Sequence, residues 1–287
     1  MVNTLIFPSD FYNKRSVDPA LRGEYEAAVA TGLFRIILFS YDKLAAEGVV
    51  EISDTTSEEC TAVYRGWMLK PDQYSLFYEE LLKRRIRLVT SPEQYQLMHV
   101  FPNVYEYVKE DTARMKVFPL YQQISVEDLK KVFVRFMVKD YVKSVKGTDF
   151  PKYFDRSVTQ EQFDSWMRKF YEYRGKLLTG GICIKEYLDL KRYGNKTNEY
   201  RVFYINHEIA TISRNSGQGI YAPMPPQKLI SKYRFLESPY YTVDYAELSD
   251  GTWVVIVAGD GSVSGLSDGQ DYEVYFRTLY HCFEEDR

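Results

Sequence analysis

The sequence predicts an α/β region followed by an α+β region in a globular chain of 287 residues. Strand-like and helix-like segments alternate over the first 120 residues, which is typical of a parallel sheet with helices on its faces. After residue 120, strand-like segments joined by turn residues predict antiparallel sheets with helices on one side. Hydrophobic residues form 45% and charged residues 27% of the chain, a balance that excludes a disordered protein.

The first region reads as a βαβ opening. Asp18 and Pro19 supply an N-cap and a first-turn proline for a helix over residues 20–30, and Gly32 is placed to end that helix. Pro71 begins a second helix with apolar residues at helical spacing. Strands are expected at residues 4–8, 34–39, 63–66 and 86–89.

The second region contains more strands and fewer helices. Helices are expected at 159–173 and 271–283, and a polar loop that contains Gly147 is expected at 146–154. Strands are expected at residues 132–139, 141–145, 182–190, 199–206, 208–213, 240–248 and 253–258. No clear linker separates the two regions, so we place the domain boundary near residue 120, giving domains 1–120 and 121–287.

Composition narrows the classes of partner. The net charge of −3 lacks the basic excess that non-specific nucleic-acid binding requires. No apolar run reaches the ~18–20 residues that span a bilayer, and the N-terminus lacks the features of a signal peptide. The three cysteines and three histidines are too scattered for a disulfide framework or a structural zinc site. We therefore expect a cytoplasmic protein that has neither nucleic acid nor membrane as a partner.

Several familiar catalytic motifs are missing from the sequence. It has no phosphate-binding loop of the Gly-x-x-x-x-Gly-Lys-Ser/Thr type and no Gly-x-Ser-x-Gly elbow. The glycine run from Gly259 to Gly265 matches the dinucleotide-binding spacing except at its last position. It lies near the C-terminus rather than in an early βαβ unit, so we discount that interpretation.

Positive charges in apolar strands are the most informative feature. Lys139, Lys143, Lys185 and Arg201 each lie in an otherwise hydrophobic segment. A charge in a half-buried strand costs free energy unless an opposite charge accompanies it. Each residue alone could be a solvent-facing charge or part of a local ion pair, but together they indicate an anion-binding site.

Carboxylates follow in the later strands. Asp244 and Asp260 lie in or near strands and carry the hard oxygen ligands that hold Mg²⁺ beside phosphate. With the cations and the flexible loop at Gly147, they suggest a site for a nucleoside triphosphate.

Two regions of the chain resemble the ATP-grasp clade that is named for one arginine and two lysines. Residues 60–98 resemble its N-terminal region, through Val63-Tyr-Arg-Gly-Trp-Met-Leu-Lys-Pro71 and Arg87-Leu-Val-Thr-Ser-Pro-Glu-Gln-Tyr95. Residues 136–266 resemble its catalytic part, through Val138-Lys-Asp-Tyr-Val-Lys143, Gly180-Gly-Ile-Cys-Ile-Lys-Glu-Tyr-Leu188, Glu199-Tyr-Arg-Val-Phe203 and Gly259-Asp-Gly-Ser-Val-Ser-Gly265. The motifs are more specific together than singly.

The resemblance implies a pre-ATP-grasp α/β domain followed by an ATP-grasp domain, whose two α+β subdomains clasp ATP. In such enzymes a carboxylate attacks the γ-phosphate to form an acylphosphate, and an amine then displaces phosphate to give an amide. The resemblance thus implies ATP and Mg²⁺ as cofactors. It implies a small-molecule or peptide carboxylate and an amine as substrates, and leaves the oligomeric state open.

Roles for the nucleotide-binding residues also follow from the resemblance. Lys139 would contact the α/β-phosphates, Lys143 would lie beside the phosphate path, and Gly147 would belong to the mobile loop over the phosphates. The adenine hinge, with Asp189 beside the ribose, would be formed by Lys185, Glu186, Tyr187 and Leu188.

The resemblance assigns catalysis to Arg201, Lys143 and Arg214. Arg201 would face the γ-phosphate or the acyl intermediate, and Arg214 with Asn215 would line the acceptor side. Arg65 either points into the cleft between the domains to bind a substrate carboxylate or pairs with an acidic neighbour.

One position departs from the ATP-grasp pattern. The family's last catalytic strand carries a metal-binding glutamate and, two residues later, an asparagine, where this chain has Val257 and Gly259. Three alternatives remain: Asp244 and Asp260 hold the metal with water, Glu247 replaces the lost ligand, or catalysis is weakened or lost.

The leading hypothesis is an ATP-dependent carboxylate–amine ligase. The alternatives are a phosphotransferase on the same fold and a nucleotide-binding protein without catalysis. A nucleotidyltransferase is disfavoured, because Lys139-Asp140-Tyr-Val lacks the Lys-x-Asp-Gly order.

Overall fold

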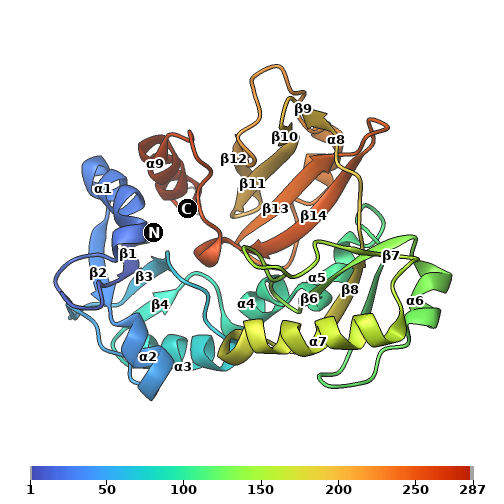
Figure 1. Ribbon diagram of the computed structural model, residues 1–287. Coiled ribbons are helices and arrows are strands. Elements are labelled where there is room, and N and C mark those ends of the chain that lie inside the picture. The colour runs from blue at the N-terminus through green and yellow to red at the C-terminus, as the bar shows by residue number, and fades with distance from the viewer. Residues whose placement is uncertain (1, 285–287) are drawn as a thin grey trace.

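The computed structural model describes residues 2–284 and contains three four-stranded β-sheets flanked by helices (Figure 1). The first sheet is parallel, with strand order β2-β1-β3-β4. Its strands are β1 (Val2–Pro8), β2 (Arg35–Phe39), β3 (Cys60–Tyr64) and β4 (Ile86–Leu88). Its connecting helices are α1 (Arg22–Thr31), α2 (Tyr41–Glu47) and α3 (Pro71–Leu82). The expected α/β region is confirmed.

Local sequence signals set the ends of α1. Asp18 accepts a hydrogen bond from the Ala20 amide at 2.9 Å, in the 3₁₀ turn η1 (Pro19–Leu21) that leads into the helix. Gly32 follows α1 with a φ of +68°, a left-handed conformation that suits glycine and closes the helix. The expected start and stop are therefore confirmed.

The second sheet is antiparallel, with strand order β5-β8-β6-β7. Its strands are β5 (Met115–Phe118), β6 (Arg135–Asp140), β7 (Phe154–Asp155) and β8 (Ile182–Glu186). One face packs against α6 (Val126–Val132) and α7 (Gln160–Arg174), and the turn η2 (Gly175–Leu177) follows α7. Thr159 and Gln162 cap the start of α7, which buries Phe163, Met167 and Phe170 in this core.

The expected strand at 141–145 is wrong. The chain turns after β6, because the Asp140 carboxylate accepts hydrogen bonds from the Val142 and Lys143 amides at 2.8 and 2.7 Å. A short acidic side chain that bonds the following backbone in this way favours a turn over a strand. The expected strand at 132–139 also begins too early, since α6 extends to Val132.

The third sheet is antiparallel, with strand order β12-β11-β13-β14. Its strands are β11 (Glu199–Ile205), β12 (Glu208–Arg214), β13 (Tyr240–Glu247) and β14 (Trp253–Asp260). Three helices that the sequence analysis missed share a core with one face: α4 (Pro92–His99), α5 (Phe101–Val108) and α8 (Gln227–Lys232). The shorter elements are β9 (Arg192–Tyr193), β10 (Lys196–Thr197) and the turn η3 (Gly261–Val263).

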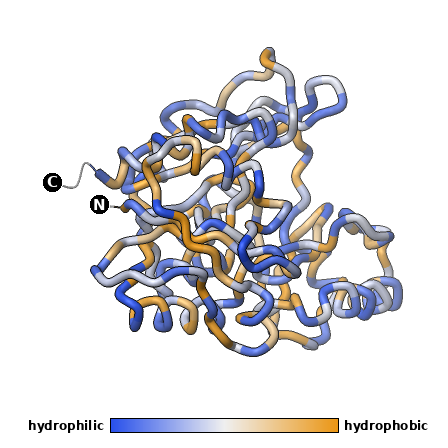
Figure 2. Tube along the Cα trace, turned by 90° about the vertical axis from the view of Figure 1, so that its left-hand side faces the viewer, coloured by the Kyte–Doolittle hydropathy of each residue, from blue (hydrophilic) through white to orange (hydrophobic). Residues whose placement is uncertain are grey.

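The last helix, α9 (Tyr272–Cys282), returns to the start of the chain and packs beside α1 (Figure 1). Leu5 and Phe7 of β1 share a buried core with Phe203 of β11 and Phe276 of α9. Figure 2 shows a band of hydrophobic residues that runs from near the N-terminus into the centre of the molecule. The first and third sheets are thus joined through a common core.

The boundary near residue 120 stays a prediction. Strand β5 ends before it, yet pairs with β8, which lies far beyond it.

Among the helices of residues 2–284, none is long and apolar enough to cross a bilayer.

Candidate functional site

A cleft of about 1030 Å³ lies between the second and third sheets. Strands β6 and β8 contribute side chains from one sheet, and β11, β13 and β14 contribute side chains from the other. Most of the site residues proposed from the sequence line it: Lys139, Lys143, Lys185, Glu186, Tyr187, Leu188, Asp189, Arg201, Asn215, Asp244 and Asp260.

Lys139 and Lys185 face the cleft from neighbouring strands. Met137 lies opposite Lys185 in the β6–β8 register, so the alternation of side chains along β6 places Lys139 on the same face. The Lys185 ammonium donates to the Ile256 carbonyl at 2.6 Å. Both ammonium groups lie over the Phe101 ring, at 4.9 Å for Lys139 and 4.4 Å for Lys185. Two positive charges thus share one buried aromatic surface.

Burial destabilises the protonated, charged form of Lys139 and Lys185. Burial lowers the pKa of Lys139, and burial together with the charge of Lys139 lowers the pKa of Lys185 to about 7. Within residues 2–284, neither ammonium has a carboxylate within salt-bridge distance. A bound polyanion would therefore stabilise both charges.

The loop after β6 supplies further positive charge. Burial, followed by the charges of Lys146 and Arg174, lowers the pKa of Lys143. Lys146 and Thr148 also line the cleft, whereas Gly147 between them does not. Gly147 has a φ of +73°, which favours glycine, and no heavy atom lies within 4 Å of the place a Cβ would take. Gly147 therefore shapes the backbone of this loop and does not line the cleft.

The segment after β8 is held by arginine side chains. Arg114 binds the Glu186 carboxylate through two nitrogens at 3.0 and 2.7 Å. The Arg135 guanidinium lies 5.3 Å from the centre of the Tyr187 ring and 3.8 Å from the Asp189 carboxylate. These contacts hold the last residue of β8 and the segment after it, which line the cleft.

Arg201 and Asp244 form a two-pronged ion pair across β11 and β13. The Arg201 Nε and one terminal nitrogen donate to the two Asp244 oxygens at 2.8 and 2.7 Å. The other terminal nitrogen donates to the Gly265 carbonyl at 2.8 Å, and the Asn215 amide lies 3.4 Å from Asp244 Oδ2. The pair fixes the plane of the guanidinium at the cleft wall.

The carboxylates do not form a metal site. Arg201 occupies both oxygens of Asp244, and the aliphatic Val257 lies opposite Asp244 on β14. Asp260 is fully buried, with Oδ1 accepting from the Ser262 amide at 2.9 Å. Burial raises the pKa of Asp260 to about 7. Across residues 2–284, no group of three His, Cys, Asp or Glu residues is arranged to hold a metal ion. The assignment of Asp244 and Asp260 as magnesium ligands does not fit this arrangement.

Glu247 does not replace the missing ligand. Its carboxylate accepts hydrogen bonds from Lys191 at 2.9 Å, Asn198 at 2.9 Å and Tyr193 at 3.0 Å, at the far end of β13.

The expectation that Arg65 faces the cleft is wrong. The alternative, that Arg65 pairs with an acidic residue, is confirmed. Its side chain is 2% exposed and binds the Glu24 carboxylate at 2.6 and 3.0 Å. It also donates to the backbone carbonyls of Gly261 and Ser264 at 2.5 and 2.9 Å. Arg65 is therefore fully engaged within the protein interior.

The expectation that Arg214 lines the acceptor side is also wrong. Ser213 lies opposite Arg201 in the β11–β12 register, and Arg214 lies opposite Tyr200. Since successive side chains of a strand point to opposite faces, Arg214 is on the face away from Arg201. Arg214 is not among the residues that line the cleft.

His99 and Phe101 are cleft residues that the sequence analysis missed. His99 ends α4 and stacks on the Tyr95 ring at 4.7 Å, and Phe101 begins α5. Burial, with the charges of Lys143 and Lys139, lowers the pKa of His99 to about 4, so its imidazole is neutral at pH 7. No motif marks either residue, because α4 and α5 reach the cleft only through tertiary packing.

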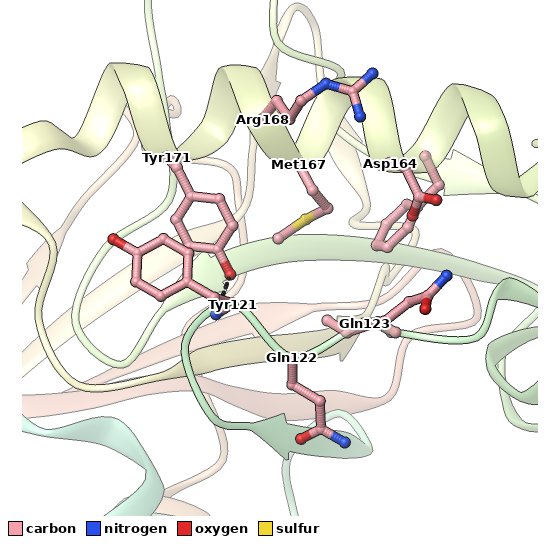
Figure 3. A pocket seen from close by; sticks show the side chains of 9 residues that line it. Tyr121, Gln122, Gln123, Asp164, Met167, Arg168 and Tyr171 are labelled. Atoms are coloured by element: carbon pink, nitrogen blue, oxygen red, sulfur yellow. Dashed lines mark hydrogen bonds between the residues drawn. The ribbon is translucent and has the colours of Figure 1, made fainter.

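A second hollow, of about 230 Å³, lies between α7 and the loop after β5 (Figure 3). The Tyr121 and Tyr171 rings lie 4.7 Å apart beside it, and the Tyr171 hydroxyl accepts from the Tyr121 amide at 2.9 Å. It is lined by one arginine and no lysine. It therefore lacks the charge for a polyphosphate and lies outside the candidate site.

Comparisons with known proteins point to one fold. Residues 127–279 match an ATP-grasp domain family, the third family of the clade that is named for one arginine and two lysines. Among curated proteins, none matches this sequence.

Solved structures of ATP-grasp ligases resemble the whole chain. D-cycloserine synthetase DcsG has a TM-score of 0.61 and 13% identity, covering 98% of this chain and 99% of its own. D-alanyl-alanine synthetase A from Vibrio cholerae O1 biovar eltor str. N16961 has a TM-score of 0.63 and 9% identity, covering 99% and 98%. The ATP-grasp ligase PsnB, complexed with minimal precursor, Mg and ADP, has a TM-score of 0.60 and 10% identity, covering 98% of both chains. At such identities the likeness shows the fold alone.

Proposed function

The chain belongs to the third family of this one-arginine, two-lysine clade of ATP-grasp domains, and we propose that it is an ATP-dependent carboxylate–amine ligase. The resemblance found in the sequence, and the fold class it implies, are both confirmed. One observation carries the proposal: Lys139, Lys185 and Arg201, from three strands of two facing sheets, line a single cleft.

The proposed nucleotide position follows from the charges. Lys139 and Lys143 would contact the triphosphate. Lys185, which the resemblance placed in the adenine hinge, would contact it as well, because its ammonium lies over the same Phe101 ring as that of Lys139. The negative charge of the triphosphate offsets the cost of burying these ammonium groups. The backbone of residues 186–188 would border the adenine, with Asp189 near the ribose.

Arg201 would orient the transferring phosphoryl group. In the first step a substrate carboxylate oxygen attacks the γ-phosphorus and ADP leaves, giving an acylphosphate. In the second step the amine nitrogen attacks the acyl carbon, phosphate leaves, and the nitrogen loses a proton to give an amide. The rigid guanidinium fork of Arg201 suits oxygens of either the γ-phosphate or the acylphosphate, and Asn215 lies beside it on the acceptor side.

The substrates we propose are amino acids or peptides. One neighbour is named as a D-alanyl-alanine synthetase and another as a ligase complexed with a precursor peptide, and both names fit a carboxylate donor with an amine acceptor.

The test measures ADP release from ATP with pooled amino acids and short peptides, and follows new products by mass spectrometry. We expect ADP and phosphate only when an acid and an amine are both present, with a product lighter than the two substrates by one water. A phosphorylated acid with no amine consumed would instead show a phosphotransferase.

A second candidate is a nucleotide-binding protein without catalysis. Val257, together with the engagement of Asp244 by Arg201, favours it. A thermal shift with ATP but no turnover of any pool would identify this case, since ligand at ~100 times its Kd adds ~2.7 kcal/mol of stability.

A further inference from the structure

The face of the third sheet that borders the cleft lacks a pair of carboxylates. Asp244 and Val257 lie opposite each other on β13 and β14, and both line the cleft. A divalent cation seated between these strands would meet an oxygen ligand on one side and a methyl group on the other. Mg²⁺ requires a near-octahedral shell of oxygens, which an aliphatic side chain cannot supply.

The other carboxylates around the cleft are engaged or remote. Arg201 binds both oxygens of Asp244, and Arg114 binds both oxygens of Glu186. Glu199 accepts a hydrogen bond from the Thr197 hydroxyl, and Asp189 is 72% exposed beside Arg135. Asp260 borders the cleft with no exposed surface, and its Oδ2 has no hydrogen-bond partner in the described part of the chain. Among the described residues, the position opposite Asp244 on β14 is therefore held by Val257 rather than by a second carboxylate.

Positive side chains outnumber carboxylates along the cleft. Seven lysine and arginine residues line it: Lys139, Lys143, Lys146, Arg174, Lys185, Arg192 and Arg201. Five carboxylates line it: Glu186, Asp189, Glu199, Asp244 and Asp260. In the described part of the chain, no carboxylate pairs with Lys139, Lys143 or Lys185. These ammonium groups can neutralise a triphosphate directly.

We infer that this cleft binds ATP without a protein-held divalent cation, taking free ATP and the Mg²⁺ complex of ATP about equally well. The inference rests on the proposed function only in that the cleft takes ATP. The lysines supply the charge compensation that a protein-held metal supplies in a site with two acidic ligands, and Val257 removes the second of those ligands.

The direct test is calorimetric titration of the full chain with ATP, in buffer with EDTA and in buffer with excess Mg²⁺. We expect the two Kd values to agree within about three-fold, a difference below ~0.7 kcal/mol. A Kd more than about ten-fold tighter with Mg²⁺ overturns the inference. No binding in either buffer overturns the nucleotide assignment itself, so the two failures are distinguishable.

Two variants at one position sharpen the test. Val257→Glu returns a carboxylate opposite Asp244, and we expect Mg²⁺ to tighten its ATP binding by at least about ten-fold. Val257→Gln has the same size without the charge and should remain insensitive to Mg²⁺. Equal insensitivity of both variants, each with a wild-type thermal transition, contradicts the role assigned to Val257. The measurement on the unmodified chain decides the main inference without either variant.

Discussion

Two arginine–carboxylate pairs form hydrogen bonds with the same loop, residues 261–266. Arg65 donates to the Gly261 and Ser264 carbonyls, and its partner Glu24 accepts from the Leu266 amide at 3.3 Å. Arg201, the partner of Asp244, donates to the Gly265 carbonyl. The Arg65 side chain is 2% exposed, whereas that of Arg201 is 20% exposed and borders the cleft.

The contrast shows that burial, rather than residue type, separates an interior arginine from one that lines the cleft. Arg65 has protein acceptors around its whole guanidinium and no open side, whereas Arg201 has a side open to the cleft. The loop between them is part of the glycine run that does not fit a dinucleotide motif. Its Gly261 packs so closely on the Tyr240 ring that a Cβ would lie 2.7 Å from it. The run thus links the interior pair, Arg65 with Glu24, to the cleft pair, Arg201 with Asp244.

The largest expected effect is on stability, at the interior pair. Arg65→Met leaves the Glu24 carboxylate buried without its partner, and we expect the free energy of unfolding to fall by about 3–5 kcal/mol. Urea denaturation would measure it. The control is the double variant Glu24→Leu with Arg65→Met, which removes both charges and should recover part of the loss. A loss below about 1 kcal/mol for the single variant would contradict the interior role.

The second-largest expected effect is a loss of ligation activity when the cleft pair is broken. Arg201→Gln removes the guanidinium that we propose orients the transferring phosphoryl group, and we expect kcat/KM for ligation to fall by about 10²-fold or more. The stability loss should be smaller than for Arg65→Met, because water can reach the cleft side of Asp244. Arg214→Gln is the matched control, from the neighbouring strand and the opposite face, and should keep near-normal activity. Equal losses for both variants would place the chemistry elsewhere.

The same two arginines show what the sequence could predict. Lys139, Lys185 and Arg201 stand out in the sequence as charges in apolar strands, but the β6–β8 register that places Lys139 and Lys185 on one face comes from the structure. Arg65 is also a charge at the end of an apolar strand, and only the tertiary partner Glu24, 41 residues away, shows that it is satisfied internally. The prediction that Arg214 lines the acceptor side was wrong because the face of Arg214 depends on the register of β11 and β12, which the sequence does not determine.

Long-range packing accounts for the remaining gaps. His99 and Phe101 reach the cleft from helices before the second sheet, so no local pattern could connect them with Lys139. The turn after β6 was missed because Asp140 competes for the backbone there, while the apolar residues around it favour a strand.

The smallest effect is a pH dependence that only the cleft should have. The interior guanidinium of Arg65 keeps its charge at every accessible pH, whereas the pKa of Lys185 is lowered to about 7 by burial and by Lys139. Bound phosphates favour the protonated ammonium, so above pH 7 the free protein must take up a proton when ATP binds. By linkage, ATP affinity should fall as pH rises above about 7, by at most about ten-fold per pH unit, and binding at pH 8 should take up protons. Calorimetry in two buffers of different ionisation enthalpy measures that uptake.

Two variants decide whether Lys185 is the group that titrates. Lys185→Gln removes the ammonium that donates to the Ile256 carbonyl and lies over Phe101, and should flatten the profile above pH 7 while weakening ATP binding at pH 6. Lys191→Gln changes a lysine that pairs with Glu247 outside the cleft lining, and should leave the profile unchanged. Because the ATP phosphates do not themselves gain protons above pH 7, a wild-type affinity that stays constant from pH 7 to 9 would mean that no phosphate contacts Lys185. In that case the open side of the cleft would be defined by Arg201 and the loop lysines alone.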